Sequence, residues 1–198
     1  MDFAGQNEKA RGMPSFSWKN RLFRAFWQLT WLLVAAWTPP ALHPWRRVVL
    51  KAFGAKVQPR SDVRGSARVW YPPNLTLGEG ALIGPKVICY NMAPIELERF
   101  ALVSQRAHLC AGNHDIDDPS FRLFSTPILL RAYSWVAADA FVAPGVTLGE
   151  GAVLGARAVA FKDLEPWTLY IGNPAAPRRT RKRPLHEAVP ETRKGTAR

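Results

Sequence analysis

The residues best suited to acid–base chemistry lie in one short polar segment, which reads Leu109-Cys-Ala-Gly-Asn-His-Asp-Ile-Asp-Asp-Pro-Ser-Phe121. Within it, His114 is flanked by Asn113 and Asp115. A hydroxyl group is a poor nucleophile, and a positioned neutral imidazole can take its proton while a new bond forms. A neighbouring carboxylate can hold the imidazole in the required tautomer. The segment therefore predicts that His114 acts as a general base.

The same segment could instead bind a divalent cation, because His114 is followed by Asp115, Asp117 and Asp118. Carboxylates are common ligands of such ions. However, no second histidine stands at ligand spacing, since His108 belongs to the preceding repeat. The pattern Asp-x-Asp-Asp-Pro is also typical of turns. We therefore expect no metal site.

A six-residue period describes the elements that must position His114. Aliphatic and small residues recur at this spacing in four runs: Val57, Val63 and Val69; Leu77 and Ile83; Leu97, Val103 and Leu109; and Val136, Val142, Leu148, Leu154 and Ala160. This period fits neither an α-helix nor a simple amphipathic strand. It fits a coil of short strands and tight corners, with one inward side chain per strand. Stacked coils bury a continuous apolar interior, so the pattern predicts a β-solenoid.

The period is interrupted at two places. One is a small irregularity at residues 90–94. The other is larger, because 27 residues separate Leu109 from Val136, and it predicts a loop extruded over residues 112–128. His114 lies in this loop, and loops held by a rigid scaffold commonly carry catalytic residues.

The segments that flank the repeats have different compositions. Aromatic and aliphatic residues at helical spacing predict two helices before the solenoid, the first capped by Ser17 or Asn20 and the second ending at Gly54. We divide the chain into a disordered N-terminus, an aromatic helical segment, a solenoid domain and a basic tail, at residues 1–16, 17–54, 55–175 and 176–198.

The longest uncharged run is residues 25–45, which contain no Lys, Arg, Asp or Glu. Prolines at 39, 40 and 44 shorten its helical part below the roughly 20 residues that a transmembrane helix needs. It also starts too late, and lacks the cleavage site, for a signal peptide. We expect a helix that either packs on the solenoid or lies at a membrane surface.

The chain is strongly basic, with 27 Lys and Arg against 15 Asp and Glu. Such a charge suits nucleic acid, an anionic membrane or a phosphate-bearing ligand. No nucleic-acid recognition motif accompanies it, so we expect no nucleic-acid partner. Cys89 and Cys110 form no CxxC pair. They predict neither a disulfide framework nor a zinc site, and they fit buried thiols of a cytoplasmic protein.

Seven motifs give the chain a family resemblance. They are Phe53-Gly-Ala-Lys-Val57, Tyr71-Pro-Pro-Asn-Leu75, Val103-Ser-Gln105, His108-Leu-Cys-Ala-Gly-Asn-His-Asp115, Ser134-Trp-Val136, Ala143-Pro-Gly-Val-Thr-Leu-Gly149 and Gly172-Asn-Pro-Ala175. Over residues 17–183 the sequence resembles the hexapeptide-repeat acetyltransferases, and among them the WcaF-like group of colanic acid biosynthesis. The block from 135 to 175 also resembles maltose, galactoside and nodulation-type acetyltransferases, so it does not specify the acceptor.

The resemblance implies a left-handed parallel β-helix that assembles into a homotrimer and uses acetyl-CoA as co-substrate. The coenzyme lies in a groove between neighbouring coils, and the extruded loop brings its histidine from the next subunit. On this basis His114 is the catalytic base, while Asn91, Asn113 and Asp115 bind the acceptor. Asn91 could instead form a turn at the irregularity.

The resemblance also implies residues for the coenzyme. Trp135 would flank the groove, the backbone of Ala137 and Ala160 would contact the pantetheine arm, and Lys162 and Arg179 would bind the phosphates, which attract cations. Trp135 could instead be a subunit contact, and Lys162 a solvated surface lysine.

The sequence leaves two classes of function open. The first is acetyl-CoA-dependent O-acetylation of a sugar hydroxyl in exopolysaccharide or related glycan biosynthesis. The hydroxyl would attack the thioester directly, because no side chain stands out as a covalent nucleophile. The alternatives are a non-catalytic scaffold at the membrane, suggested by residues 17–45 and the basic tail, and an acyltransferase with an amino acceptor. The intact segment around His114 favours the enzyme.

Overall fold

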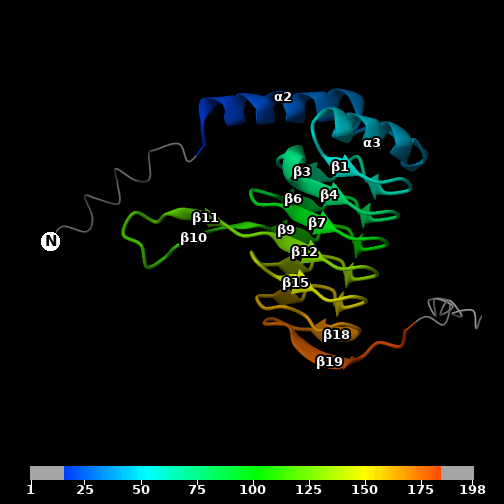
Figure 1. Cartoon of the computed structure of the whole chain (residues 1–198), viewed down its shortest axis with the longest axis vertical. Helices are drawn as coiled ribbons and strands as arrows, with labels where there is room; N and C mark the ends of the chain where they lie inside the picture. Colours follow the sequence, from blue (N-terminus) through cyan, green and yellow to red (C-terminus); the bar gives the residue numbers. More distant parts are fainter. Residues whose placement is uncertain (1–15, 184–198) are drawn as a thin grey trace, which may run out of the picture.

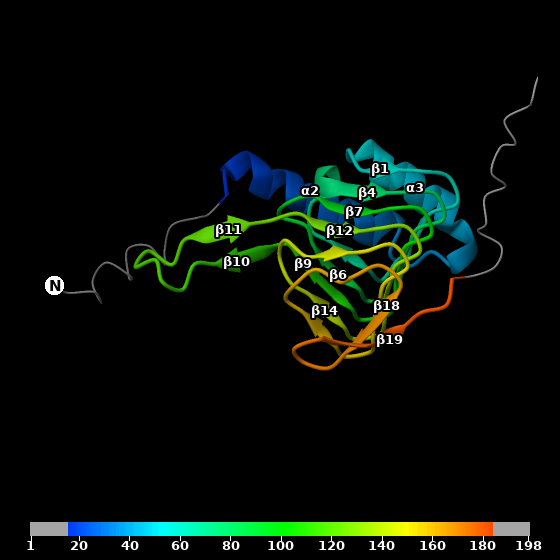
Figure 2. The same ribbon diagram turned by 60° about the horizontal axis from the view of Figure 1, so that its bottom comes forward.

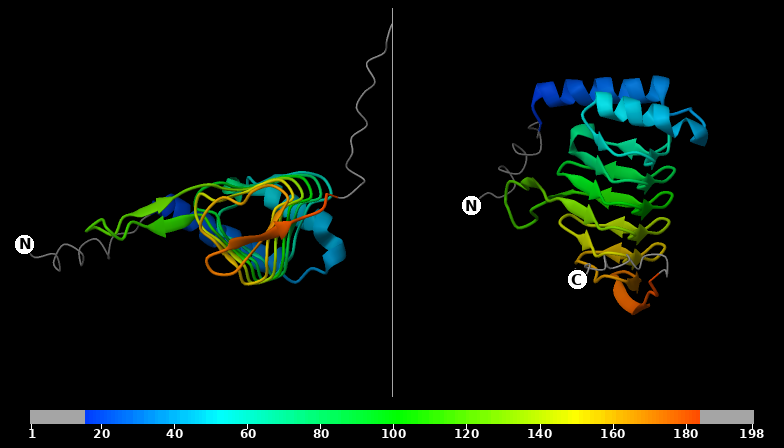
Figure 3. Two further views of the ribbon diagram at one scale, coloured as in Figure 1. Left: turned by 90° about the horizontal axis from the view of Figure 1, so that it is seen from below. Right: turned by 45° about the vertical axis from the view of Figure 1, so that its right-hand side comes forward.

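The structure, a computed structural model that describes residues 16–183, is a column of stacked coils with helices across one end (Figure 1). Seen along the column, each coil is a triangle of three short strands joined by tight corners (Figure 3). The strands of successive coils pair in parallel, and the column is a left-handed β-helix. The predicted fold class is therefore confirmed.

Each side of the triangle is a parallel sheet. The first face contains β1 (Lys56–Val57), β4 (Leu75–Leu77), β7 (Ile95–Leu97), β12 (Ile128–Leu130) and β15 (Thr147–Leu148). The second contains β2 (Asp62–Val63), β5 (Leu82–Ile83), β8 (Leu102–Val103), β13 (Trp135–Val136), β16 (Val153–Leu154), β18 (Thr168–Ile171) and β19 (Ala176–Thr180). The third contains β3 (Arg68–Val69), β6 (Ile88–Tyr90), β9 (His108–Cys110), β14 (Phe141–Val142) and β17 (Val159–Ala160).

The core consists of three columns of inward side chains, one for each face. Strand register stacks the members of each column directly on one another: Val57, Leu77, Leu97, Leu130 and Leu148; Val63, Ile83, Val103, Val136, Leu154 and Tyr170; and Val69, Cys89, Leu109, Val142 and Ala160. All of them are buried. Because neighbouring strands lie about 4.8 Å apart, each side chain is in van der Waals contact with the next. Burial raises the pKa of the Cys89 thiol to about 12, which keeps it protonated and unreactive.

Both predicted interruptions of the period lie where the sequence placed them. At residues 91–94 the chain bends, next to a short 3₁₀ turn, η2 (Pro72–Asn74), in the coil before it. The larger interruption is a β-hairpin of β10 (Gly112–His114) and β11 (Leu123–Ser125). The hairpin leaves the column between the third and first faces and projects well beyond it (Figure 2).

The N-terminal helices close the first coil. They are α2 (Trp18–Val34), the short η1 (Pro40–Leu42) and α3 (His43–Ala52). Ser17 caps α2 by accepting a bond from the backbone of Asn20 at 3.3 Å. At the end of α3, Gly54 has φ +91°, the left-handed geometry that the sequence predicted there. Residues 1–15, expected to be disordered, lie outside the described residues.

Side chains of this helical cap bond to the exposed backbone edge of the first coil. The indole N–H groups of Trp27 and Trp31 donate to the carbonyl oxygens of Val69 and Gly65, at 2.8 and 2.9 Å. A sheet edge otherwise presents unpaired carbonyl groups. The cap therefore satisfies this edge with side-chain donors rather than with another strand.

Arg46 is the central residue of this contact, and its side chain is buried. Its guanidinium donates to the carbonyl oxygen of Val63 at 2.7 Å, to the hydroxyl of Thr38 at 2.9 Å and to the carboxylate of Asp62 at 2.9 Å. It also bonds to the carbonyl oxygen of Pro39 at 2.8 Å. A buried charge is tolerated only with such a full set of partners. Arg46 thereby joins α3 to the solenoid.

The opposite end of the column closes differently. β19 pairs antiparallel with β18, although its residues were assigned to the basic tail by the sequence analysis. Arg181 follows it and donates to the carbonyl oxygens of Tyr133 and Gly151, at 3.0 Å each. The tail thus begins later than expected, because the strand edge of β18 offers backbone partners to a polar segment. Tail residues 184–198 lie outside the described part of the chain.

Candidate active site

The hairpin that carries His114 is fixed at its root. Gly112 begins β10 and lies against the end of the second coil, where an added Cβ would stand 2.5 Å from the sulfur of Met92 and 3.0 Å from the ring of Tyr90. The Cys110 thiol donates to the carbonyl oxygen of Gly112 at 3.2 Å. A larger residue here would have to displace the Met92 side chain, so the root of the hairpin is closely packed.

The imidazole of His114 is held by the other strand of its own hairpin. Its Nδ1 lies 2.8 Å from the carbonyl oxygen of Phe121. Its ring stacks on the Phe121 ring, with centroids 4.6 Å apart and planes 15° from parallel. A carbonyl oxygen can only accept, so Nδ1 carries the proton and donates. In the neutral imidazole the lone pair is then on Nε2, the form that a general base needs.

The orienting group is thus a backbone carbonyl, not the carboxylate that the sequence analysis expected. Two of the three aspartate side chains in the segment, those of Asp115 and Asp118, stabilise the hairpin tip instead. Asp115 accepts from the backbone N–H of Asp117 at 3.1 Å, and Asp118 accepts from the backbone and hydroxyl of Ser120 at 2.8 and 2.7 Å. The hydrogen bond from the Ser120 hydroxyl is the main cause that lowers the pKa of Asp118, and the bond from the Ser120 backbone N–H is the next. Arg122 lies 3.6 Å from Asp118 and 4.0 Å from Asp115.

The predicted acceptor residues occupy two different environments. Asn113 is exposed on the hairpin beside His114, whose backbone N–H donates to its side-chain oxygen at 2.8 Å. Asn91, by contrast, is completely buried. Its side-chain amide accepts from the backbone N–H groups of Trp70 and Tyr71 and donates to the carbonyl oxygen of Tyr71, at 3.1, 3.0 and 2.7 Å. Asn91 therefore holds the turn at the irregularity, which is the alternative that the sequence left open.

Two of the predicted coenzyme residues lie in one outward row of the second face. Trp135 pairs with Val153, Val153 with Leu169, and Leu169 with Arg179. Three strand spacings, or about 15 Å, therefore separate Trp135 from Arg179. The Trp135 indole donates to the Ser104 hydroxyl at 2.9 Å and remains 39% exposed. The row could flank an extended ligand.

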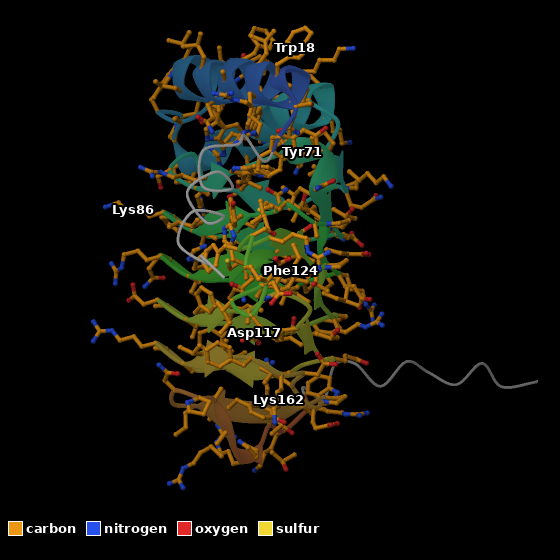
Figure 4. The ribbon with its side chains drawn as sticks, turned by 90° about the vertical axis from the view of Figure 1, so that its left-hand side faces the viewer. Trp18, Tyr71, Lys86, Asp117, Phe124 and Lys162 are labelled. Atoms are coloured by element: carbon orange, nitrogen blue, oxygen red, sulfur yellow. The ribbon has the colours of Figure 1, made fainter. Side chains whose placement is uncertain are left out.

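The remaining coenzyme residues have fewer groups to offer. Ala137 donates its N–H to the carbonyl oxygen of Leu154 at 2.9 Å, and the carbonyl oxygen of Ala160 accepts from Ala143 at 2.9 Å. Both backbone groups already belong to the ladder. Lys162 is exposed at the corner after β17, two coils beyond β9, and Figure 4 labels it below the hairpin residues Asp117 and Phe124.

The hairpin and the second-face row are not brought together within one chain. The row lies on the second face, whereas the hairpin leaves from the corner between the other two faces (Figures 2 and 3). Within one chain, His114 and the candidate coenzyme row therefore lie on different sides of the column. No group of three or more His, Cys, Asp or Glu side chains that could hold a metal ion occurs between residues 16 and 183.

Sequence reasoning missed the role of Phe121 and an apolar cavity below α2. The cavity has a volume of about 460 Å³ and is lined by residues of the cap and of the third face, including Trp27, Trp31, Trp70 and Tyr90. At its edge the Arg24 guanidinium lies over the Trp70 ring, 4.2 Å from the centroid. Only the high aromatic content of residues 16–37 and 70–71 could have indicated it.

The three faces differ in their outward side chains. The second face presents Asp62, Leu82, Leu102, Trp135, Val153, Leu169 and Arg179, and the third presents Arg68, Ile88, His108, Phe141 and Val159. The first presents Lys56, Thr76, Glu96, Leu129 and Thr147. His108 packs edge-on against Phe141 with centroids 5.2 Å apart, and burial lowers its pKa. Two faces are thus mostly apolar and one mostly polar.

Comparison with known proteins finds related acetyltransferases. No protein-family model matches the chain. The colanic acid biosynthesis acetyltransferase WcaF of Escherichia coli is 41% identical over 151 residues, which cover 75% of this chain and 83% of WcaF. An acetyltransferase of Schizosaccharomyces pombe is 35% identical over 104 residues, covering 52% of this chain and 42% of the relative.

Solved structures with the same fold have lower sequence identity. A maltose O-acetyltransferase of Clostridium difficile has a TM-score of 0.74 and 21% identity, covering 84% of this chain and 90% of its own. A Vibrio cholerae hexapeptide-repeat acetyltransferase in complex with acetyl coenzyme A has a TM-score of 0.75 and 19% identity, covering 92% and 100%. A galactoside acetyltransferase in complex with coenzyme A has a TM-score of 0.71 and 18% identity, covering 91% of each chain.

Proposed function

Because this chain belongs to the WcaF-like colanic acid biosynthesis acetyltransferases of the hexapeptide-repeat family, we propose that it transfers an acetyl group from acetyl-CoA to a sugar hydroxyl in exopolysaccharide or related glycan biosynthesis. The name of its 41% identical relative supports the pathway. Two structures of the same fold hold acetyl-CoA or coenzyme A, which supports the donor. The maltose and galactoside enzymes among its structural neighbours support a sugar acceptor.

The chemistry proposed for His114 is direct transfer. Nε2 accepts the proton of the sugar hydroxyl as its oxygen forms a bond to the thioester carbonyl carbon. The tetrahedral intermediate then collapses and breaks the carbon–sulfur bond, and the departing sulfur takes the proton back from the imidazolium. The products are an acetyl ester and free coenzyme A, and His114 returns to its neutral form. The single observation that carries this role is the bond from Nδ1 to the Phe121 carbonyl oxygen.

The arrangement of the faces supports a homotrimer with its sites between subunits. A three-fold assembly would bury the mostly apolar second and third faces and leave the polar first face in water. It would also bring the hairpin of one subunit towards the row of Trp135 and Arg179 on another. Both halves of the site would then meet only in the assembly.

Sedimentation analysis tests this assembly. Leu102→Glu places a charge in the centre of the second face and should convert trimers to monomers, because a buried unpaired charge is costly. Thr76→Glu on the first face is the matched control and should remain trimeric. A wild-type monomer, or trimers unaffected by Leu102→Glu, would contradict the proposed interface.

The activity is tested by thiol release from acetyl-CoA in the presence of a panel of sugars and lipid-linked oligosaccharides. His114→Gln should lower acceptor-dependent release by roughly 10²-fold or more. His43→Gln, a substitution of the same type on α3, is the control and should leave the rate unchanged. Equal rates in the two variants would exclude His114 as the base.

The same assay separates the alternatives. Release that requires an amino sugar would identify an amino acceptor. Absence of release with every acceptor would favour a scaffold. Phe121→Ala should lower the rate less than His114→Gln does, and it should also change the pH profile, because the stacked ring and the turn position the imidazole without contacting substrate.

A further inference from the structure

The outer side of the helical cap is unusually apolar. Of the eighteen large apolar side chains exposed between residues 16 and 183, ten belong to the cap. We call these ten the outer apolar face: Trp18, Leu22, Phe26, Leu29, Leu32, Leu33, Trp37, Leu42, Trp45 and Val48. So many exposed large apolar side chains within one small part of a structure commonly mark a binding surface.

The outer apolar face is built by the spacing of residues in α2. Trp27 and Trp31 point towards the solenoid and are buried. Leu22 and Leu29 are seven residues apart and on the opposite side of the helix, 62% and 53% exposed. Trp18, at the start of this row, points away from the column (Figure 4). A helix with apolar residues on opposite sides needs a second apolar contact besides the solenoid.

The exposed tryptophans of this face have their polar groups already satisfied. The Trp37 indole donates to the carbonyl oxygen of Leu33 at 2.8 Å, and the Trp45 indole donates to that of Val34 at 2.7 Å. Both acceptors lie in the last turn of α2, where carbonyl groups lack helical partners. The rings can therefore enter an apolar medium without leaving an unpaired donor. Tryptophan is also the residue most typical of the interface between lipid and water.

The charge around this face selects an anionic partner. Residues 16–61 contain eight Lys and Arg and no Asp or Glu. Lys19 and Arg21 flank the apolar row at the start of α2, and Lys51 is exposed on α3. Two copies of the chain meeting through this face would bring like charges together. An anionic lipid surface attracts them, and each basic residue near it adds to binding.

We propose that the outer apolar face is a docking surface for a membrane that contains anionic lipid. α2 lies across the end of the column (Figure 1), and its 17 residues span about 25 Å. It would lie flat at the level of the lipid head groups, with its apolar row towards the acyl chains. Docking by this surface is peripheral, because no helix among residues 16–183 is long and apolar enough to cross a membrane. Leu32 also lines the cavity below α2, so the cavity and the outer apolar face meet there.

Vesicle co-sedimentation of the full chain tests the proposal without acetyl-CoA or acceptor, so its outcome is independent of the proposed activity. The probes are vesicles of phosphatidylcholine alone and vesicles of phosphatidylcholine and phosphatidylglycerol in equal parts. The wild type should bind the anionic vesicles and bind them less well in high salt. Absence of wild-type binding to the anionic vesicles would overturn the proposal.

Two variants separate the apolar and electrostatic contributions. Leu22→Gln/Leu29→Gln should lower partitioning into anionic vesicles at least tenfold, because two leucines no longer leave water. Lys19→Gln/Arg21→Gln should lower it by roughly tenfold on anionic vesicles and change nothing on neutral ones. Phe161→Gln/Ile171→Gln, at exposed apolar positions near the other end of the column, is the control and should bind as the wild type does.

A further measurement tests whether the outer apolar face instead contacts a second copy of the chain. Light scattering should give the same oligomeric state for wild type and Leu22→Gln/Leu29→Gln. A smaller particle for this variant, together with vesicle binding equal to wild type, would identify the outer apolar face as a contact between copies of the chain and overturn the proposal.

Discussion

The two ends of the solenoid satisfy their strand edges in different ways. At the N-terminal end, Trp27, Trp31 and Arg46 donate from helices to the backbone of the first coil. At the C-terminal end, β19 adds an antiparallel strand whose five residues are all exposed. Both devices satisfy a strand edge, but only the helical one carries an apolar outer side. Closing the column therefore does not require that apolar side, which supports a separate role for it.

The largest expected effect lies at the centre of the helical cap. Arg46→Met would leave Asp62 and several carbonyl groups without their buried donor, although Asp62 keeps Arg64 at 3.3 Å. Removal of one partner from a buried, bonded charge pair costs about 3–5 kcal/mol. Denaturant unfolding should show this loss, whereas Arg60→Met, at an exposed arginine beside Glu79, should change stability by less than about 0.5 kcal/mol. A small effect of Arg46→Met would mean that side-chain donors do not hold this end.

A smaller loss is expected from the indole donors. Trp27→Phe keeps most of the buried ring but removes the bond to the Val69 carbonyl oxygen. An unsatisfied buried acceptor costs about 1–3 kcal/mol. Denaturant unfolding of Trp27→Phe should therefore show a loss of stability between zero and that of Arg46→Met. Trp37→Phe, whose ring is exposed, should be close to wild type in the same assay. Equal stability of Trp27→Phe and wild type would show that the edge is satisfied by other means.

The C-terminal end should be less sensitive to a single side chain. Arg181→Ala removes two bonds to backbone carbonyl oxygens, but the backbone pairing of β18 and β19 remains. We expect a loss of about 1 kcal/mol in the same unfolding assay. If this loss matched that of Arg46→Met, the contrast between the two ends would fail.

The smallest effect is expected on the outer apolar face. Leu29→Gln changes an exposed side chain on a helix and should alter the free energy of unfolding by less than about 0.5 kcal/mol. Its binding to anionic vesicles should nevertheless fall. A large loss of stability would instead show that Leu29 packs within the fold of this chain or its assembly.

The repeat pattern predicted most of the fold because each coil offers the same inward position once per strand. Cys89 and Leu130 escaped the pattern, the first because it is not aliphatic and the second because the hairpin precedes it. β19 could not be predicted, since its Pro177 and arginines are atypical of a strand. Proline is tolerated there because β19 is an edge strand.

For the candidate site, the residue types could be predicted from the sequence but their geometry could not. His114 stood out because a polar segment interrupts a regular repeat. The group that orients His114 could not be recognised in the sequence, because it is the backbone carbonyl of Phe121. Phe121 has a φ of +51°, a backbone conformation that its residue type does not predict. Side-chain chemistry alone suggested a carboxylate instead. In the same way, the burial of Asn91 depends on contacts with the preceding coil, 20 residues earlier in the chain.

The regular stacking of the coils has a consequence for distance. Each coil adds one strand spacing, about 4.8 Å, to the column. The hairpin follows β9, two coils beyond β3, on which the cap rests. With the cap on a bilayer, two spacings and the thickness of a helix would hold the hairpin root at a stand-off of about 20 Å. The number of coils would then set this distance, and one more coil inserted before β9 would move His114 one strand spacing further from the bilayer.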